Sequence, residues 1–551
     1  MNFKENETLD KLRGGYYTPA GIAQFLTRWV LSPQPKSLLE PSCGDGAFIR
    51  ALAGLHSHTL ALTAIERDGD EAVKAAAAAR ELKKVKADVV NEDFLAWAEA
   101  RLEKGAHYDA VTGNPPYIRY QYLDEVDQVL SESIFRRYQL RFTKHTNAWV
   151  PFVIACIGLL APGGRLGMVI PSEILHVLHA GSLRSFLLAQ ASKIFMIDPN
   201  ELLFSEALQG TVLLMVEKKR APSDPSDGVA IYSAPDNTFL QLDPDSLFDS
   251  AKFVAGDVLN GKWMKVLLTS EELSAFEKAR SLPGVKRFSD VATVDVGIVT
   301  GANKFFLVSD DVVKAHGLEE FARPMFGRSE HCPGVIYDDS VHLANGEKGY
   351  PSNFLMFGKT AVKDLPRSVR RYITSGEADE LHTRYKCRIR TPWYAVPSVY
   401  STEIGMLKRA HNFPRLILNT AGAYTTDTAY RIRSLGTAPE KLVYCFINSL
   451  TALTAELEGR HYGGGVLELV PSEIEKLLIP LAPELQPRLA ALDDAVRQPV
   501  QGELLLKKQD DHILHAVGLS AQECTLIRQA LLRVRSRRHR LLDGVDAGAV
   551  E

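Results

Sequence analysis

"LLEPSCGDGAF" (38–48) has the pattern of a strand that passes through a glycine-containing turn into a helix. The apolar run ends at Glu40, Gly44 and Gly46 follow, and a helical pattern opens near Asp45. Glycines in such a turn let the backbone approach a ligand closely, as in nucleotide-binding sheets. The stretch therefore predicts a strand-turn-helix unit, which is either a ligand site or an ordinary turn that needs glycine.

The same alternation continues through about the first 220 residues. Apolar or β-branched runs that predict strands lie at 36–40, 61–66, 87–94, 108–114, 164–171, 193–199 and 211–219, with helical patterns between the first five. This alternation is typical of a doubly wound, mostly parallel α/β sheet. A short connection joins the last two runs, so we expect them to form an antiparallel edge.

Composition divides the rest of the chain. Pro, Ser, Asp and Gly gather at 218–228, and beyond 250 short apolar runs lie among turns. A chain of 551 residues is long enough for two or three domains. We predict a first domain over 1–222, a linker or loop over 223–250, an irregular α+β domain over 251–484 and a helical segment over 485–551.

The bulk numbers exclude several classes of protein. A net charge of −3 excludes a globally basic polycation but permits a local basic groove. The six cysteines form no CxxC pair, so we expect neither a metal site nor a disulfide framework, and scattered thiols are typical of a reducing cytoplasm. The longest apolar stretch, "AWVPFVIACIGLLAPGG" (148–164), is too short for a membrane helix. These features indicate a cytoplasmic protein.

Two acidic residues extend the glycine turn into a candidate nucleotide site. Glu66 ends the second predicted strand 20 residues after Gly46 (66 − 46 = 20), where nucleotide-binding sheets place an acid for the ribose hydroxyls. The GxGxxG of dinucleotide folds is absent, so an adenosyl ligand smaller than NAD fits better. Glu40, at the end of the first strand, is suited to attract a cationic group such as an amine.

Asp93 and Phe94 end the third predicted strand and have two interpretations. An acid with a neighbouring ring can bind the amino group of adenine and cover its face. A residue pair of this kind is more often a helix N-cap and its first apolar residue, with Asp93 accepting backbone hydrogen bonds. Both interpretations stay open on these residues alone.

The fourth predicted strand ends in "NPPY" (114–117). Ligands of open α/β sheets bind outside the carboxyl ends of the strands, so this motif should face the ligand of the first two strands. The Asn114 side chain and the Pro115 carbonyl are two rigid hydrogen-bond acceptors, which suit an exocyclic amine. Tyr117 can stack on the planar base that carries the amine. The alternative is a common strand-ending Asn-Pro turn.

A basic, aromatic stretch over 384–415 predicts a nucleic-acid surface. It holds seven Lys/Arg residues and one acid, with Trp393, Tyr394 and Tyr400 between them. The candidate DNA-binding residues are Arg384, Lys386, Arg388, Arg390, Lys408, Arg409 and Arg415. The alternative is a solvated face. The arginines at 527–540 could either bind phosphate or lie on an exposed helix with no specific role.

The chain resembles the N6-adenine-specific DNA methyltransferases of gamma motif order, in which the methyltransferase domain precedes a target-recognition domain. The resemblance covers about 13–220. It rests on "GGYYTP" (14–19), "LEPSCGDGAF" (39–48), "AIERD" (64–68), "EDFL" (92–95), "NPPY" (114–117), "PGGRLGMVIP" (162–171) and "ELLFSEALQGTVLLMVEK" (201–218), in the family's order. "GRHYGGGVLELVPSEIEKLLIP" (459–480) looks like the family's recognition domains. The resemblance implies a class I S-adenosylmethionine-dependent methyltransferase fold with a seven-stranded Rossmann-like sheet.

The resemblance also implies a cofactor, S-adenosylmethionine, and the residues that bind it. Thr18 would touch its methionine part, Glu40 its amino group and Glu66 its ribose, while Asp93 and Phe94 would hold its adenine. The full set of cofactor-binding residues is then Thr18, Glu40, Ser42, Cys43, Gly44, Asp45, Gly46, Glu66, Asp93, Phe94 and Pro116.

The catalytic roles implied by the resemblance fall on the fourth strand. Asn114 and Pro115 would accept hydrogen bonds from N6 of a flipped-out adenine in double-stranded DNA, and Tyr117 would stack on that base. Phe204 would be a second aromatic contact. No metal is implied. The family's place in restriction-modification systems implies a separate cognate endonuclease, and its members often act as monomers.

Other functions fit parts of this pattern. "NPPY" also occurs in same-fold enzymes that methylate a protein glutamine, and relatives methylate RNA, but such chains are usually shorter. A fused restriction-modification enzyme would need a nuclease constellation of Pro-Asp…Glu-x-Lys type, of which no convincing example is found here. A non-catalytic DNA-binding subunit would predict degraded motifs, whereas Glu40, Gly44, Glu66 and Asn114 are all present.

Overall fold

The computed structural model describes residues 17–55, 59–200, 210–462, 464–498 and 502–539. Two compact units divide the chain between Leu267 and Leu268. The first unit holds the sheet predicted from the N-terminal motifs, and the second holds most of the remaining residues. Within these described ranges, no helix is long and apolar enough to cross a membrane.

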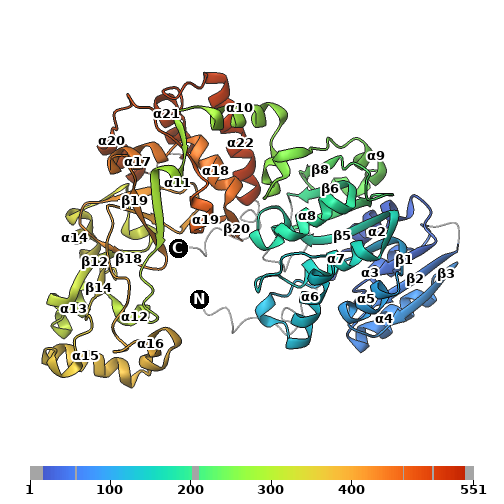
Figure 1. Cartoon of the computed structure of the whole chain (residues 1–551), viewed down its shortest axis with the longest axis horizontal. Helices are drawn as coiled ribbons and strands as arrows, with labels where there is room; N and C mark the ends of the chain where they lie inside the picture. The colour runs from blue at the N-terminus through green and yellow to red at the C-terminus, as the bar shows by residue number, and fades with distance from the viewer. Residues whose placement is uncertain (1–16, 56–58, 201–209, 463, 499–501, 540–551) are drawn as a thin grey trace. The chain divides into compact units, whose positions relative to one another are not determined.

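A mixed sheet forms the centre of the first unit (Figure 1). Over the described residues it has eight strands in the order β3-β2-β1-β4-β5-β7-β6-β8. All neighbours pair in parallel except β7, which is antiparallel to both β5 and β6. The strands are β1 (Ser37–Glu40), β2 (Leu60–Ile65), β3 (Val85–Val90), β4 (Tyr108–Gly113), β5 (Leu160–Pro171), β6 (Ala191–Pro199), β7 (Thr211–Lys218) and β8 (Gly228–Ala234).

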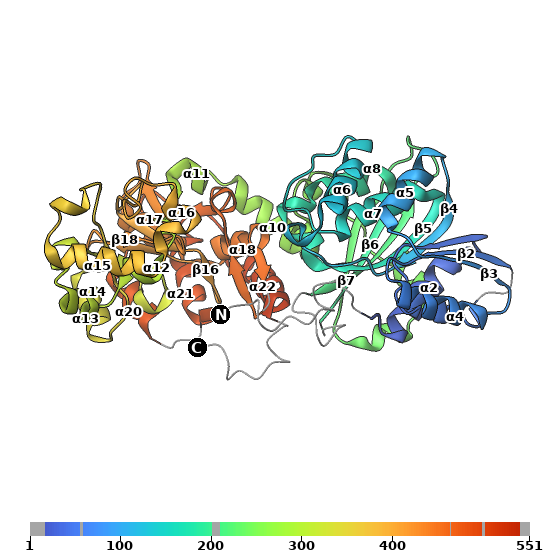
Figure 2. The same cartoon turned by 90° about the horizontal axis from the view of Figure 1, so that it is seen from below.

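Helices cover both faces of this sheet (Figure 2). One layer contains α2 (Ala20–Leu31), α3 (Ala47–Ala51), α4 (Gly69–Arg80) and α9 (Pro244–Asp249). The other contains α5 (Phe94–Glu103), α6 (Glu125–Arg137), α7 (Trp149–Leu159) and α8 (Gly181–Gln190). The α7 sequence, "WVPFVIACIGL", is apolar on every side because α5, α6, α8 and the sheet surround it. The predicted α/β fold class is confirmed.

The far edge of the sheet differs from the prediction. The antiparallel pairing of the last two predicted strands is confirmed, but β7 lies inside the sheet, between β5 and β6. Residues 223–250, which we predicted to be a linker or loop, contain the edge strand β8 and helix α9. They belong to the first unit because Val229 and Ala230 are buried beside β6, and Phe248 packs on Trp29 with ring centroids 5.1 Å apart.

The second unit is the predicted α+β region, and over its described residues it contains four smaller sheets. The strands are β9 (Val285–Arg287), β10 (Ala292–Val296), β11 (Leu307–Val308), β12 (Ala322–Phe326), β13 (Ile336–Tyr337), β14 (Asn353–Leu355), β15 (Ile404–Leu407), β16 (Arg409–Ala410), β17 (Leu416–Asn419), β18 (Tyr424–Thr425), β19 (Ala429–Ser434), β20 (Arg460–Tyr462), β21 (Val466–Glu468) and β22 (Leu478–Pro480). The orders are β10-β19-β15-β17-β13, β11-β14-β12-β18, β16-β21-β20 and β22-β9.

Helices of the second unit surround these sheets. They are α10 (Ser270–Ser281), α11 (Phe288–Val291), α12 (Asn303–Phe306), α13 (Asp310–His316), α14 (Asp339–Glu347), α15 (Arg367–Ala378), α16 (Tyr385–Arg388), α17 (Pro439–Phe446), α18 (Ser449–Glu458), α19 (Pro471–Ile474), α20 (Leu489–Arg497), α21 (Gly502–Ile513) and α22 (Ala521–His539). α10 begins with a complete capping box, in which Thr269 and Glu272 exchange side-chain-to-backbone bonds.

The described part of the predicted C-terminal segment is largely helical, and up to Arg538 it belongs to the second unit and is not a separate part of the chain. Its last helix, α22, joins the unit through arginines that pair with acids of other helices. Arg538 contacts Glu456 of α18 at 2.6 Å, and both side chains are fully buried. Arg533 contacts Glu272 of α10 at 3.0 Å. The arginine-rich sequence of α22 therefore serves internal ion pairs, which neither of our two interpretations anticipated.

Candidate active site

The turn after β1 has the backbone geometry that its glycines predict. Gly44 and Gly46 lie in the left-handed region, with φ of +51° and +92°. A Cβ atom on Gly46 would lie 3.2 Å from the Cα of Ala75, so glycine allows the turn to pack against α4. Cys43 is buried, and its backbone N–H donates to the Ile65 carbonyl at 2.9 Å. The turn is thus fixed between β2 and α4.

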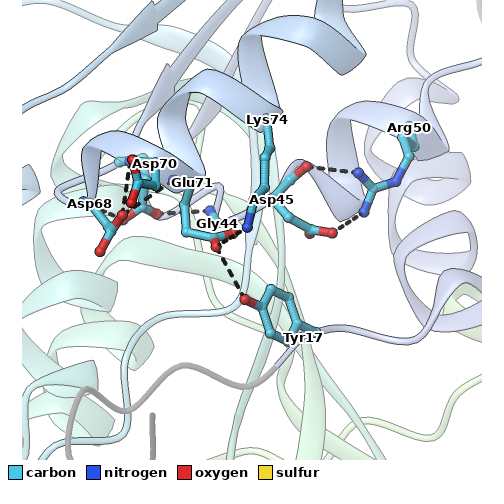
Figure 3. A network of polar contacts seen from close by, with 9 residues as sticks. Tyr17, Gly44, Asp45, Arg50, Asp68, Asp70, Glu71 and Lys74 are labelled. Atoms are coloured by element: carbon cyan, nitrogen blue, oxygen red, sulfur yellow. Dashed lines mark hydrogen bonds and ion pairs between the residues drawn. The ribbon is translucent and has the colours of Figure 1, made fainter. Parts of the chain in front are cut away.

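Glu66 follows β2 and binds this turn directly. Its Oε2 atom accepts from the Gly44 N–H at 2.8 Å, and its Oε1 atom accepts from the Asp68 N–H at 2.8 Å. Figure 3 shows the surrounding network, in which Asp68 caps α4 and Asp45 pairs with Arg50 at 2.7 Å. The glycine turn and the end of β2, which the spacing between Gly46 and Glu66 singled out as one candidate site, therefore lie in contact.

Glu40 is the most unusual group of the site. Its side chain is 1% exposed, and its Oε1 atom has no hydrogen-bond partner among the described residues. Burial raises the pKa of Glu40 well above its ordinary value, and the negative charges of Glu66 and Asp45 raise it further. A buried carboxyl without a partner is costly unless a ligand completes it. The position is therefore suited to a cationic group.

The NPPY residues meet the glycine turn and the N-terminal motif. The Ser42 hydroxyl donates to the backbone carbonyl of Asn114 at 2.9 Å, and Asn114 Nδ2 donates to the Thr18 hydroxyl at 3.2 Å. A Cβ atom on Gly113 would lie 3.1 Å from Pro41, so β4 approaches the turn closely. Three segments far apart in sequence thus converge at the carboxyl ends of β1 and β4, as the open-sheet rule predicts.

The rest of the NPPY motif lies along the same edge. Pro115 is buried, whereas Pro116 and Tyr117 are half-buried. The Tyr117 hydroxyl donates to the Val169 carbonyl of β5 at 3.1 Å, which fixes the direction of the ring. Phe204, the predicted second aromatic, lies outside the described residues.

Asp93 and Phe94 lie differently from the other predicted cofactor residues. Asp93 caps α5 by accepting from the Ala96 N–H at 3.0 Å, which is the helix-cap interpretation. Phe94 is 2% exposed and packs on Phe152 of α7, with ring centroids 4.9 Å apart. Their contacts are with the helices of this layer and not with the glycine turn, so their role toward a cofactor stays a prediction.

Two further residues stabilise the site, and the sequence analysis did not identify either of them. Asn91 Nδ2 donates to the carbonyls of Glu66 and Arg67, at 2.8 and 3.0 Å. The Tyr17 hydroxyl donates to Glu71 of α4 at 3.3 Å, which anchors the segment that carries Thr18 (Figure 3). Asn91 directly follows β3. Its position at the carboxyl end of a strand, where open sheets bind ligands, was the sequence signal that could have identified it.

The seven predicted DNA-binding residues separate into two groups. Arg390 donates to the carbonyls of Val299 and Thr300, and Arg415 to the carbonyl of Cys332. Lys408 and Arg409 both pair with Glu468, at 3.3 and 2.8 Å. The other three, Arg384, Lys386 and Arg388, are exposed and form no ion pair with any acid in the described ranges.

Two protein-family models match this chain. Residues 55–204 match the Eco57I restriction-modification methylase model, and residues 260–514 match the C-terminal domain of the Type II methyltransferase M.Eco57I. The first match begins after the glycine turn and covers β2, Glu66, the NPPY motif, β5 and β6, and the second covers most of the second unit.

Similar proteins extend over most of the chain. Type II methyltransferase M.AccI of Acinetobacter calcoaceticus is 24% identical over 487 residues, which cover 84% of each protein. Type II methyltransferase M.XamI of Xanthomonas campestris pv. amaranthicola is 24% identical over 486 residues and 85% of each protein. Among solved structures, the type IIG restriction endonuclease BpuSI matches with a TM-score of 0.42 and 15% identity, over 96% of this chain and 67% of that chain.

Proposed function

We propose that the chain is a restriction-modification methyltransferase of the Eco57I type, whose family models match its two parts, and that it transfers a methyl group from S-adenosylmethionine to N6 of adenine in a short sequence of duplex DNA. One observation carries the proposal. Thr18, Ser42 and Asn114, from three separate motifs, are joined by hydrogen bonds beside the buried Glu40. This arrangement brings Glu40 and the NPPY motif together at the carboxyl ends of β1 and β4, which supports the roles proposed for them.

The described residues fit S-adenosylmethionine. Glu40 offers a buried oxygen without a partner among the described residues to the cofactor's amino group, and Thr18 of the N-terminal segment is bonded to Asn114. A Cβ atom on Gly44 would meet nothing within 4 Å, so the turn has room for a ligand. Each Glu66 oxygen has a second lone pair for a ribose hydroxyl. The cofactor, once bound, supplies a methyl group activated by a positively charged sulfur.

The residues of the NPPY motif prepare the nucleophile. The N6 lone pair of adenine is delocalised into the ring, so the amine attacks poorly. Acceptors at Asn114 and Pro115 draw both N–H bonds toward them and localise the lone pair on N6. Positioning of this kind supplies a large share of the rate. The base must leave the duplex to reach the motif, and Tyr117 offsets the lost stacking by about 1–3 kcal/mol.

Replacing Glu40 by glutamine tests the cofactor site. We expect the Kd for S-adenosylmethionine to rise about 10- to 100-fold, because a hydrogen bond to a charged group is lost. Isothermal titration calorimetry with the full chain measures it. Glu81→Gln, at the exposed end of α4, is the matched control and should bind as the wild type does. Equal affinity in Glu40→Gln and the wild type would remove Glu40 from the site.

The pH dependence of cofactor binding is a second test of the role proposed for Glu40. Because the pKa of Glu40 is raised in the free protein, the carboxyl holds its proton at a pH where ordinary carboxyls are ionised. An ammonium partner favours the ionised form, so binding releases that proton. We expect affinity to increase as the pH rises toward the raised pKa, and Glu40→Gln to show no such increase. A wild-type affinity that falls over this range would contradict the assignment.

We propose that the exposed turn Arg384–Arg388 of the second unit contacts the DNA backbone. Its three cations form no internal ion pairs within the described ranges, and Tyr385 is 64% exposed among them. The position of the turn is fixed by two contacts. The Cys387 side chain is fully buried, and the Arg390 guanidinium donates to the carbonyls of Val299 and Thr300. Phosphates are the partners that unpaired lysine and arginine side chains prefer on such a surface.

Removing the three cations should weaken binding in a salt-dependent manner. For Arg384→Ala/Lys386→Ala/Arg388→Ala, we expect the slope of log K against log salt to decrease in magnitude by up to about 2.7, or roughly 0.9 for each lost phosphate contact. Fluorescence anisotropy with a labelled 30-base-pair duplex measures the slope. Lys408→Ala/Arg409→Ala comes from the same stretch, but Glu468 already pairs with both cations. This control should keep the wild-type slope, and equal losses in the two variants would reject the turn as the contact.

Transfer of labelled methyl from S-adenosylmethionine to unmodified bacterial DNA, followed by long-read mapping of modified bases, tests the whole proposal. N6-methyladenine at one recurring sequence supports it and reveals the recognition site. Transfer to RNA or to protein, with no label on DNA, would favour the same-fold alternatives. Cleavage of the DNA by the purified chain would indicate a fused enzyme, whereas we expect a separate endonuclease and a monomeric methyltransferase.

A further inference from the structure

A half-buried amide-carboxylate pair lies next to the NPPY motif and has no role in the mechanism above. Glu173 belongs to the 3-10 turn η2 (Ser172–Leu175), which directly continues β5. Its Oε2 atom accepts from Asn147 Nδ2 at 2.9 Å, and its side chain is 16% exposed. Asn147 directly precedes Ala148, the N-cap residue of α7. The bond therefore ties the end of β5 to the start of the helix that packs on it.

This pair is connected to the catalytic motif through the backbone. The Ala148 N–H donates to the Ile118 carbonyl at 2.9 Å, and Ile118 directly follows Tyr117. Tyr117 is itself bonded to the Val169 carbonyl of β5. The segment that leaves the motif is thus held on one side by β5 and on the other by Ala148, whose neighbour Asn147 is held by Glu173.

The surroundings of Glu173 favour a strong bond. Burial raises the pKa of Glu173, while the Asn147 bond, the positive charge of Arg119 and the Trp149 side chain act in the opposite direction. His179 lies 3.9 Å from the same oxygen. Charge-assisted hydrogen bonds are stronger than neutral ones, and a bond of this kind limits the movement of both partners.

We infer that Asn147 and Glu173 are positioning residues for methyl transfer, which hold the 114–118 segment so that its two acceptors and its ring meet the target amine. The inference rests on the proposed function of that motif. Neither side chain is assigned a contact with the substrate. Their effect passes through Ala148 and Ile118, and a displacement of about 1 Å at reacting groups can lower a rate about 100-fold.

Asn147→Ala and Glu173→Ala test the inference in the full-length protein. We expect each to lower the single-turnover rate on unmodified bacterial DNA by about 10- to 100-fold, with the KM for S-adenosylmethionine within about twofold of the wild type. The double variant should be no slower than the slower single variant, because one bond is lost in all three. Glu173→Gln, which keeps an oxygen acceptor for Asn147, should recover most of the rate.

Hydrogen exchange separates this inference from the proposed function. Backbone amides of Tyr117–Tyr120 should exchange faster in both alanine variants than in the wild type, and this readout requires no substrate. Glu132→Ala, on the exposed face of α6, is the matched control and should change neither rate nor exchange. Wild-type rates and unchanged exchange in both alanine variants would overturn the inference. A wild-type protein that methylates no DNA would count against the proposed function, while the exchange data would still decide the positioning.

Discussion

Asn114→Ala should lower methyl transfer to DNA by about 1000-fold, which takes turnover below detection, while S-adenosylmethionine still binds. Preorganised hydrogen-bond partners at a reacting centre are commonly worth about 100- to 1000-fold each. Alanine removes both the proposed acceptor for the N6 amine and the donor that bonds the Thr18 hydroxyl. The backbone carbonyl that Ser42 binds is retained, so the turn should keep its path. Single-turnover transfer and calorimetric cofactor binding measure the two effects separately.

Two further variants sharpen this test. Asn114→Asp keeps a side-chain acceptor and should be more active than Asn114→Ala. Asn260→Ala removes an exposed asparagine side chain from the same unit, where the amide only bonds Asp257, and should match the wild type. If Asn114→Ala turned over at the wild-type rate, the proposed activation of N6 would be wrong.

Arg538→Ala should destabilise the second unit by about 3–5 kcal/mol, because it leaves the charge of Glu456 buried without its main partner. Arg538 Nη2 lies 2.6 Å from Glu456 Oε1, Arg538 Nε lies 3.0 Å from Oε2, and both side chains are at most 1% exposed. The charges of Arg538 and His461 keep the pKa of Glu456 low, at about 2, despite its burial. Urea unfolding followed by circular dichroism measures the change.

The same helix provides a matched control. Arg535→Ala breaks the pair with Glu503, which is 60% exposed, and should cost at most about 1 kcal/mol. Replacing both Arg538 and Glu456 by hydrophobic residues of similar size should be far milder than Arg538→Ala, because no unpaired charge remains. An Arg538→Ala protein as stable as Arg535→Ala would show that Glu456 finds another partner.

Much of the first unit could be predicted because its signals are local. Strand β4 and its NPPY terminus were readable from an apolar run that stops at two prolines. The edge strand β8 was not, because the loop signal of 218–228 was extended over "GVAIYSA", a run that pairs with β6 along its length and with Val254 at Val229. Its burial depends on a neighbour about 35 residues earlier in the chain, and no local pattern reports that neighbour.

The site shows the same division between local and distant information. Glycine spacing correctly joined Gly44 to Glu66, and strand order brought Asn114 to Ser42 and Thr18. The basic stretch was harder to interpret because charge alone does not reveal pairing. Arg409 is as cationic as Arg388 in the sequence, yet only the fold places Glu468 beside Arg409. Asn147 was overlooked because its partner, Glu173, follows a strand that we did not connect with it.

The arginines of α22 also bear on the timing of synthesis at the ribosome. Nearly all of the first unit has emerged once Leu267 has been made, but Glu456 and Glu272 meet their partners only when Arg538 and Arg533 have been made. That interval is 538 − 267 = 271 residues, or roughly 14 to 54 s at bacterial to eukaryotic elongation rates. During this time a folded first unit would be tethered to a second unit with uncompensated acids. The cell therefore has a folded methyltransferase-type unit before it has a completed second unit.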